Sequence, residues 1–261
     1  MHQLTSAMGF AGKYMLAACR VSLTARLGFC STHVMCNKQA RIILARDGFA
    51  GAARVLESFS KELDLGVCWP DSGWGSLHHF YHAKTGAGLL TMKAANVFFE
   101  RYYLTALHLW RKGSFEKAMF FLGAVTHLLQ DICEPHHTNC SWGLWHSNYE
   151  KWVRDNKYAY LVQQGGIYLR QQHDPVNWLK KCAQSSYQLI DLVGEKSCES
   201  FYKQATGHLL PMTQQITAGF WLDFLSHAGV IQPSRMVLTA FTTPGNLAPT
   251  GGERPAQKLI S

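Results

Sequence analysis

Residues 127–150 read HLLQDICEPHHTNCSWGLWHSNYE and carry the strongest signal in this chain. Twice in this stretch a histidine is followed four residues later by a carboxylate, first in His127 and Asp131 and then in His146 and Glu150. On an α-helix such residues lie on the same face, one turn apart. Each pair can therefore hold one metal ion between an imidazole nitrogen and a carboxylate oxygen. This mixture of nitrogen and oxygen ligands is typical of zinc sites.

Two further histidines, His136 and His137, lie between these pairs and follow Pro135, where we expect the helix to stop. A single His-x-x-x-Asp pair would most often be a chance arrangement of surface or core residues. Six candidate ligands within 24 residues, at helical spacing, are instead the pattern of a metal site.

The composition is that of a globular protein. Of the 261 residues, 47% are hydrophobic and only 16% are charged, which suits one domain with a substantial core. The net charge of +8 suits an anionic partner such as a lipid surface or a phosphate-bearing substrate. Nucleic acid also fits that charge, but no long run of lysine and arginine favours it. No run of 18 apolar residues occurs, so we expect no transmembrane helix.

Helical periodicity dominates the chain, and the sequence predicts an all-α, single-domain helical bundle. Ser31 and Thr32 are expected to cap the first helix, and Gly113 to end the third. The segment from Ser114 to Ile132 is apolar nearly all round, which predicts a central, buried helix. The expected helices cover residues 33–46, about 50–63, about 89–112, 115–132, about 144–164, a segment opened by Pro175, and about 198–227.

We expect the chain to divide into three parts. Residues 1–30 form an N-terminal segment that processing could remove, 31–230 the domain that carries the candidate metal ligands, and 231–261 an irregular tail rich in proline and glycine. Lys13 and Arg20 interrupt the apolar stretch 14–24, so the sequence gives only a weak export signal. Eight cysteines are present without a Cys-x-x-Cys motif, and their pairing stays open.

A second polar region lies at residues 66–82, a predicted loop with Asp71 followed by His78, His79 and His82. A third element is His33, near the start of the first expected helix. The positive end of the helix dipole disfavours a charged histidine there, whereas a neutral, metal-binding one carries no such cost.

The order of these blocks resembles the bacterial zinc-dependent phospholipase C family. The blocks are Thr-His-x-Met at residues 32–35, Gly-x-x-x-Pro-Asp at 66–71, His-Phe-Tyr at 79–81, His-x-x-x-Asp-x-x-x-Pro-x-His at 127–137, and His-Ser-x-Tyr-Glu at 146–150. The resemblance covers about residues 31–155. It implies an all-helical enzyme that binds three zinc ions in one cleft.

The resemblance also implies a ligand for each ion. One zinc would be held by Asp71, His79, His127 and Asp131. A second would share Asp131 and be bound by His33. A third would be held by His137, His146 and Glu150. Only a carboxylate offers two anionic oxygens pointing apart, which suits the shared position at 131.

Some positions have rivals. His136 competes with His137, because Asn139 fits the family spacing when counted from His136. His78 and His82 compete with His79, which is preferred because Phe80 and Tyr81 follow it directly.

The chain departs from the family at two places. Mature family members begin with a tryptophan whose amine and carbonyl bind the second zinc, but the first tryptophan here is Trp69. Two aromatic positions of the family's choline pocket are Ser72 and Ser76 here, and Trp74 lies between them. Head-group preference therefore does not transfer from the family.

These observations predict a zinc-dependent phospholipase C with two to three zinc ions, acting on phospholipid at a membrane surface. Its products would be diacylglycerol and a phosphorylated head group. Asp71 is the candidate catalytic residue, orienting or deprotonating the attacking water. By resemblance we expect a monomer, secreted or on the cell surface, with no nucleic acid as partner.

Two alternatives stay open. One is a single-strand-specific zinc nuclease or 3′-nucleotidase on a related scaffold, although such enzymes typically have aspartate where Glu150 stands. The other is a zinc-binding homologue without catalysis.

Overall fold

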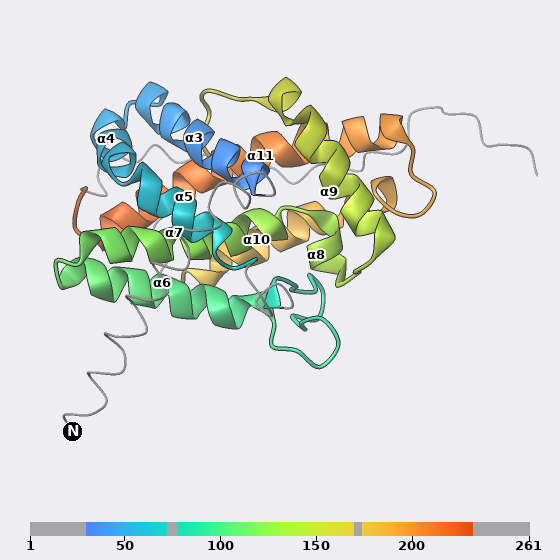
Figure 1. Cartoon of the computed structure of the whole chain (residues 1–261), viewed down its shortest axis with the longest axis horizontal. Helices are drawn as coiled ribbons and strands as arrows, with labels where there is room; N and C mark the ends of the chain where they lie inside the picture. The colour runs from blue at the N-terminus through green and yellow to red at the C-terminus, as the bar shows by residue number, and fades with distance from the viewer. Residues whose placement is uncertain (1–29, 72–77, 170–173, 232–261) are drawn as a thin grey trace, which may run out of the picture.

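Helix α7 (Phe115–Ile132) lies at the centre of the fold in the computed structural model, which describes residues 30–71, 78–169 and 174–231 (Figure 1). Every residue from Ala118 to Ile132 except Phe121 is buried, which confirms the central helix expected from its apolar sequence. Helices α5 and α6 flank α7, and α8, α10 and α11 also contact it.

The other helices complete an all-α bundle, as the sequence predicts, and no strand occurs in the described residues. They are α3 (Ser31–Arg46), α4 (Ala50–Ser58), α5 (Ser60–Cys68), α6 (Ala95–Arg111), α8 (Pro135–Asn139), α9 (Leu144–Asn156), α10 (Val176–Tyr187) and α11 (Glu199–His227), with 3-10 turns η2 (Lys157–Tyr160) and η3 (Ile190–Leu192). None of the described helices is long and apolar enough to cross a membrane.

Two expected helices are interrupted or shortened by tertiary packing. The helix expected over 50–63 breaks at Phe59, whose backbone is not helical and whose ring packs against Trp110. The next helix, α5, then continues into the predicted loop and ends at Cys68. Helix α6 begins only at Ala95, because the preceding residues form turns in which Leu90 adopts a positive φ of 52°.

The expected caps differ as well. Ser31 and Thr32 lie inside the first turn of α3, whose N-cap is Cys30. Pro135 does not end α7, which stops at Ile132; it occupies the first turn of α8, a position where its missing N–H costs nothing. Helix α9 ends at Asn156 rather than near 164, and a 3-10 turn follows it.

Several expectations fall on residues outside the described ranges. These are the N-terminal segment up to residue 29, the tail from residue 232, and Ser72, Trp74 and Ser76 of the family's head-group region.

Helices α5 and α7 pack backbone against backbone. A Cβ atom added at Gly66 would lie 2.0 Å from the carbonyl oxygen of Phe120, and one added at Gly123 would lie 2.3 Å from that of Leu63. Both distances are far below van der Waals contact, so only glycine fits at these crossings. The close approach brings the backbone carbonyl of Val67 to 2.6 Å from Nδ1 of His127. Packing in the core therefore positions a candidate metal ligand.

Candidate metal centre

Four of the sequence-predicted ligands converge beside α7. Nδ1 of His79 lies 2.8 Å from Oδ2 of Asp131, and Nε2 of His127 lies 3.1 Å from the same oxygen. Oδ1 of Asp71 approaches these two nitrogens at 3.6 and 3.4 Å. The residues come from the turn after α5, the extended segment before α6, and one face of α7. Together they form the first cluster: Asp71, His79, His127 and Asp131.

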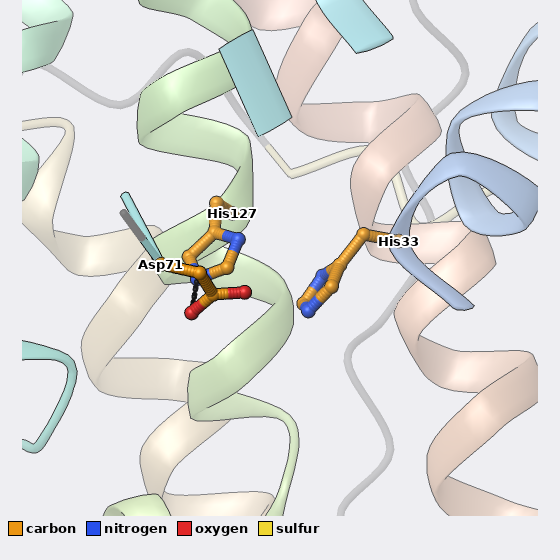
Figure 2. A group of neighbouring side chains, drawn as sticks. All are labelled: His33, Asp71 and His127. Atoms are coloured by element: carbon orange, nitrogen blue, oxygen red, sulfur yellow. Dashed lines mark ion pairs between the residues drawn. The ribbon is translucent and has the colours of Figure 1, made fainter. Parts of the chain in front are cut away.

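Asp131 faces two ways. While its Oδ2 points into the first cluster, its Oδ1 lies 3.3 Å from Nε2 of His33 on α3. The imidazole rings of His33 and His127 stack, with centroids 4.4 Å apart. Figure 2 shows His33, Asp71 and His127 directed toward the same space, with the ion pair between Asp71 and His127 dashed. One carboxylate thus joins the first cluster to a second position beside His33.

The other predicted ligands form a further cluster at α8 and α9. Nε2 of His146 lies 3.1 Å from Nε2 of His137 and 2.9 Å from Oε1 of Glu150. The same Glu150 oxygen is 3.5 Å from Nε2 of His137. Glu134 was not among the predicted ligands, yet its Oε2 lies 3.7 Å from Nε2 of His146 and 4.0 Å from Nε2 of His137. We count the position beside His33 as the second. The third cluster then consists of Glu134, His137, His146 and Glu150.

Hydrogen bonds outside the clusters fix how several rings face. Nδ1 of His127 donates to the carbonyl oxygen of Val67 at 2.6 Å, and Nδ1 of His137 donates to that of His79 at 3.3 Å. With the proton on Nδ1, each ring presents the lone pair of Nε2 to its cluster. Lone pairs and carboxylate oxygens then face one another, an arrangement that a bound cation stabilises. This orientation of the ring by a backbone carbonyl is the usual support of a metal-bound histidine.

The electrostatics of the clusters favour positive charge at His127 and His137. Burial alone lowers the pKa of His127, but Asp131 and Asp71 outweigh it and raise that pKa well above its ordinary value. Burial likewise opposes protonation of His137, yet the carboxylates of Asp131, Glu150 and Glu134 raise its pKa to about 9. Burial raises the pKa of Asp131, but His127 and His137 hold it well below its usual range. The donor set, its crowding and its charge all fit divalent cations.

All three positions open into one cleft of about 330 Å³, lined by residues that include His33, Asp71, Asp131, His137 and Glu150. The size is that of a small-molecule site. The third cluster is close to the first, since Nδ1 of His137 lies 4.0 Å from Oδ2 of Asp131.

The rival histidines make other contacts, although His136 lies beside the third cluster. Nδ1 of His136 pairs with Oε1 of Glu134 at 2.5 Å, and the ring stacks beside His146. His78 stacks on Phe98, and His82 accepts from the backbone of the turn that follows it. The structure thus brings His79 and His137 into the clusters rather than their neighbours.

Two participants gave no clear signal in the sequence. Glu134 is the N-cap of α8, where its carboxylate accepts from the backbone N–H groups of His136 and His137 at 2.9 and 3.1 Å. A glutamate just before a proline is a hint of such a cap, but its approach to His146 needs the fold. Gln130 touches His33 across the bundle, a contact that no local pattern could indicate.

An all-helical bundle whose cleft gathers clusters of histidines and carboxylates that could hold metal ions defines a class of metal-dependent proteins. Comparison with known proteins narrows that class. Residues 32–205 match the family described as zinc dependent phospholipase C, and the chain belongs to this family of zinc-dependent phosphodiesterases.

Named relatives agree with this assignment. The chain is 28% identical over 223 residues to a phospholipase C of Listeria monocytogenes, which covers 75% of this chain and 77% of the relative. It is 27% identical over 172 residues to a phospholipase C of Bacillus cereus, covering 56% of this chain and 61% of the relative.

Solved structures show the same fold. The alpha toxin of Clostridium absonum matches with a TM-score of 0.67 at 21% identity, covering 75% of this chain. The alpha-toxin of Clostridium perfringens matches with a TM-score of 0.65 at 20% identity, covering 76% of this chain. This chain spans 63% of the length of each toxin chain.

Proposed function

We propose that this chain is a phospholipase C that hydrolyses the glycerol-side phosphodiester bond of phospholipids, releasing diacylglycerol and a phosphorylated head group. The observation that carries the proposal is the double approach of Asp131, whose two oxygens face His33 on one side and His79 with His127 on the other. A carboxylate shared between two cation positions, with a third cluster in the same cleft, suits a doubly oxygenated anionic group such as a phosphodiester.

The proposed ligand sets follow the clusters, with Glu134 as a neighbouring charge beside the third set. Asp71, His79, His127 and Asp131 would hold one zinc, His33 and Asp131 a second, and His137, His146 and Glu150 a third. Bound zinc supplies Lewis acidity, which stabilises charge on phosphate oxygens and makes water a better nucleophile near neutral pH. We propose two to three ions per chain. Elemental analysis of freshly purified, unchelated protein tests this, and less than one zinc per chain would overturn it.

Asp71 is the proposed catalytic residue. Its side chain is 49% exposed, whereas that of Asp131 is 7% exposed, so Asp71 is the carboxylate of the first cluster that water reaches most readily. Both of its contacts with the histidines use Oδ1. Its Oδ2 takes no part in those contacts and is placed to orient a water molecule or accept its proton.

The substrate class is tested by supplying zinc-loaded protein with mixed phospholipid vesicles and, separately, with single-stranded DNA. We expect diacylglycerol from the vesicles and little cleavage of DNA. Robust DNA cleavage without lipid turnover would overturn the proposal. We also propose relaxed head-group selectivity, because serines occupy positions 72 and 76. Comparable rates on choline, ethanolamine and serine lipids are expected, and a sharp preference for choline would contradict this.

We further propose that residues 31–230 form the catalytic unit and that the protein acts as a monomer outside the cell that makes it. Two of the structural relatives are named toxins, and toxins act outside the producing cell. Detection of the protein in culture medium, with its mature N-terminus read by mass spectrometry, tests export. Light scattering of the purified protein tests the monomer.

A further inference from the structure

Three large apolar side chains stand in solvent at the junction of α8 and α9. Trp142 is 75% exposed, Leu144 66% and Trp145 41%, all within four consecutive residues. Single exposed apolar residues are ordinary on protein surfaces, but a cluster that includes two tryptophans marks a binding surface. The segment around them contains no charged residue between Cys140 and Trp145.

The cluster borders the metal cleft. Trp142 lines the cleft together with His137, His146 and Glu150 of the third cluster. The apolar surface therefore begins where the proposed metal site ends. A partner that covers it would lie across the mouth through which a substrate enters.

A second loop extends the same surface. Residues 82–93 contact the α8–α9 junction, since Sγ of Cys140 lies 3.6 Å from the carbonyl oxygen of Ala87 and the N–H of Ala83 donates to Thr138 at 2.9 Å. Both segments lie at the same end of the molecule (Figure 1). Leu90 in this loop is 90% exposed and has a positive φ of 52°, a conformation that costs energy for leucine.

The charge of these two segments is one-sided. Lys84 and Lys93 are exposed in the 82–93 loop, and neither this loop nor residues 140–145 contain a carboxylate. Tryptophan, with an apolar body and a polar N–H, is enriched where a bilayer meets water. Lysines beside such residues attract anionic lipid head groups. The combination of exposed Trp and Leu with unopposed lysines is complementary to an anionic bilayer surface.

We propose that Trp142, Leu144, Trp145 and Leu90, with Lys84 and Lys93, form a docking rim that inserts into the interface of a bilayer containing anionic phospholipid. The rim would place the cleft against the head groups. This inference rests on the proposed phospholipase function, because it takes the lipid surface to be the place where substrate is found.

The first experiment measures binding apart from catalysis. The probe is a vesicle of phosphonate analogues of phosphatidylcholine and phosphatidylglycerol, in which a methylene group replaces the glycerol-side ester oxygen. Binding of the zinc-loaded protein is followed by cosedimentation. We expect the double variant Leu144→Ser and Trp145→Ser to bind about tenfold or more weakly. The matched control changes two exposed apolar residues on α6, Val97→Ser and Leu104→Ser, and should bind like the parent.

The second experiment compares two lipid substrates. Hydrolysis of vesicles by the Leu144→Ser and Trp145→Ser variant should fall with its binding. Its kcat/KM on a short-chain phospholipid kept below the critical micelle concentration should stay within about twofold of the parent, because neither residue lines the cleft. Equal loss on both substrates would place these residues in the catalytic machinery and overturn the docking rim.

The outcomes separate docking from function. If the Leu144→Ser and Trp145→Ser variant binds vesicles like the parent and still hydrolyses lipid, the docking rim is wrong and the phospholipase proposal is unaffected. If the variant binds vesicles more weakly but the parent protein hydrolyses no lipid, the docking rim is supported and the phospholipase proposal is wrong. A third variant, Lys84→Gln and Lys93→Gln, should lose binding to anionic but not to purely zwitterionic vesicles. A change of oligomeric state in place of lipid binding would assign the surface to another copy of the chain and overturn the proposal.

Discussion

The side-chain oxygen of Gln130 lies 2.8 Å from Nδ1 of His33. Its direction is fixed, because the amide nitrogen of Gln130 donates to Asn37 and to Thr217, each at 3.2 Å. The oxygen must therefore accept from Nδ1 of His33. That leaves the lone pair of Nε2 directed at Oδ1 of Asp131, 3.3 Å away. Gln130 thus holds His33 in the tautomer that a metal ion needs.

We expect Gln130→Ala to weaken zinc binding beside His33 by about 10- to 100-fold, the usual effect of removing a group that orients a metal ligand. Competition with a graded chelator, followed by metal counting, measures this. Gln130→Glu keeps an acceptor for Nδ1 and should bind zinc better than Gln130→Ala. The matched control is Gln39→Ala, another buried glutamine, which lies on α3 and is a member of none of the clusters. Equal zinc affinity in Gln39→Ala and Gln130→Ala would rule out the orienting role.

Asp131→Asn should remove more zinc than Glu150→Gln. Asp131 approaches histidines on two sides, whereas Glu150 contacts His137 and His146 within one cluster. Loss of the shared charge should empty one position and weaken its neighbour, while loss of Glu150 disturbs one position. Metal content and phospholipid turnover of both variants provide the measurement. The same zinc content and activity in the two variants would show that Asp131 is not shared.

Glu134 offers a way to separate capping from metal binding. Glu134→Gln keeps an oxygen that can accept from the N–H groups of His136 and His137, but it removes the charge facing His146. Glu134→Ala removes both and should also cost about 0.5–2 kcal/mol of stability. We expect both variants to bind zinc more weakly at the third cluster. Without zinc, only the alanine variant should melt at a lower temperature, because metal binding no longer contributes to stability. Full zinc affinity in Glu134→Gln would limit this residue to its capping role.

Gly123→Ala should damage both the fold and the metal site. The added methyl group would meet the carbonyl oxygen of Leu63 at 2.3 Å, so α5 and α7 must separate. Overpacking of this kind costs about 1–3 kcal/mol or more. Separation also pulls Val67 away from His127 and should lower zinc affinity. Gly51→Ala is the control, because nothing lies within 4 Å of its added Cβ. Denaturant unfolding and zinc titration of the two variants test this, and equal stability would contradict it.

The sequence predicted the long helices well, because their apolar period or their caps are unambiguous. Gly113 has the positive φ expected of a residue just beyond a helix, and α11 begins within one residue of the expected start. The prediction of helix bounds was wrong where tertiary contacts override local preference. Phe59 interrupts a good helical pattern to pack against Trp110, and the turn around Leu90 replaces the expected first turn of α6.

The site shows the same division. His127 with Asp131 and His146 with Glu150 lie one helical turn apart, so spacing alone brought each pair together. His79 and His33 come from segments distant in the chain. The sequence marked both regions as candidates, but only the family resemblance assigned them to the same site as His127. Gln130 stayed hidden, because its partner on α3 lies 97 residues away in sequence.

Helix α7 is buried and helix α9 is largely exposed, so the two sides of the cleft should differ in rigidity. His127 and Asp131 are set in a helix buried along nearly its whole length, whereas only His146 and Tyr149 are buried in α9. Local opening is easiest where few side chains are buried, so α9 can lift from the bundle while α7 stays in place. Ion release should then be ordered in time. We expect the third cluster to exchange its ion with isotopically labelled zinc fastest, and the ion held by His127 and Asp131 to leave only as the core itself opens.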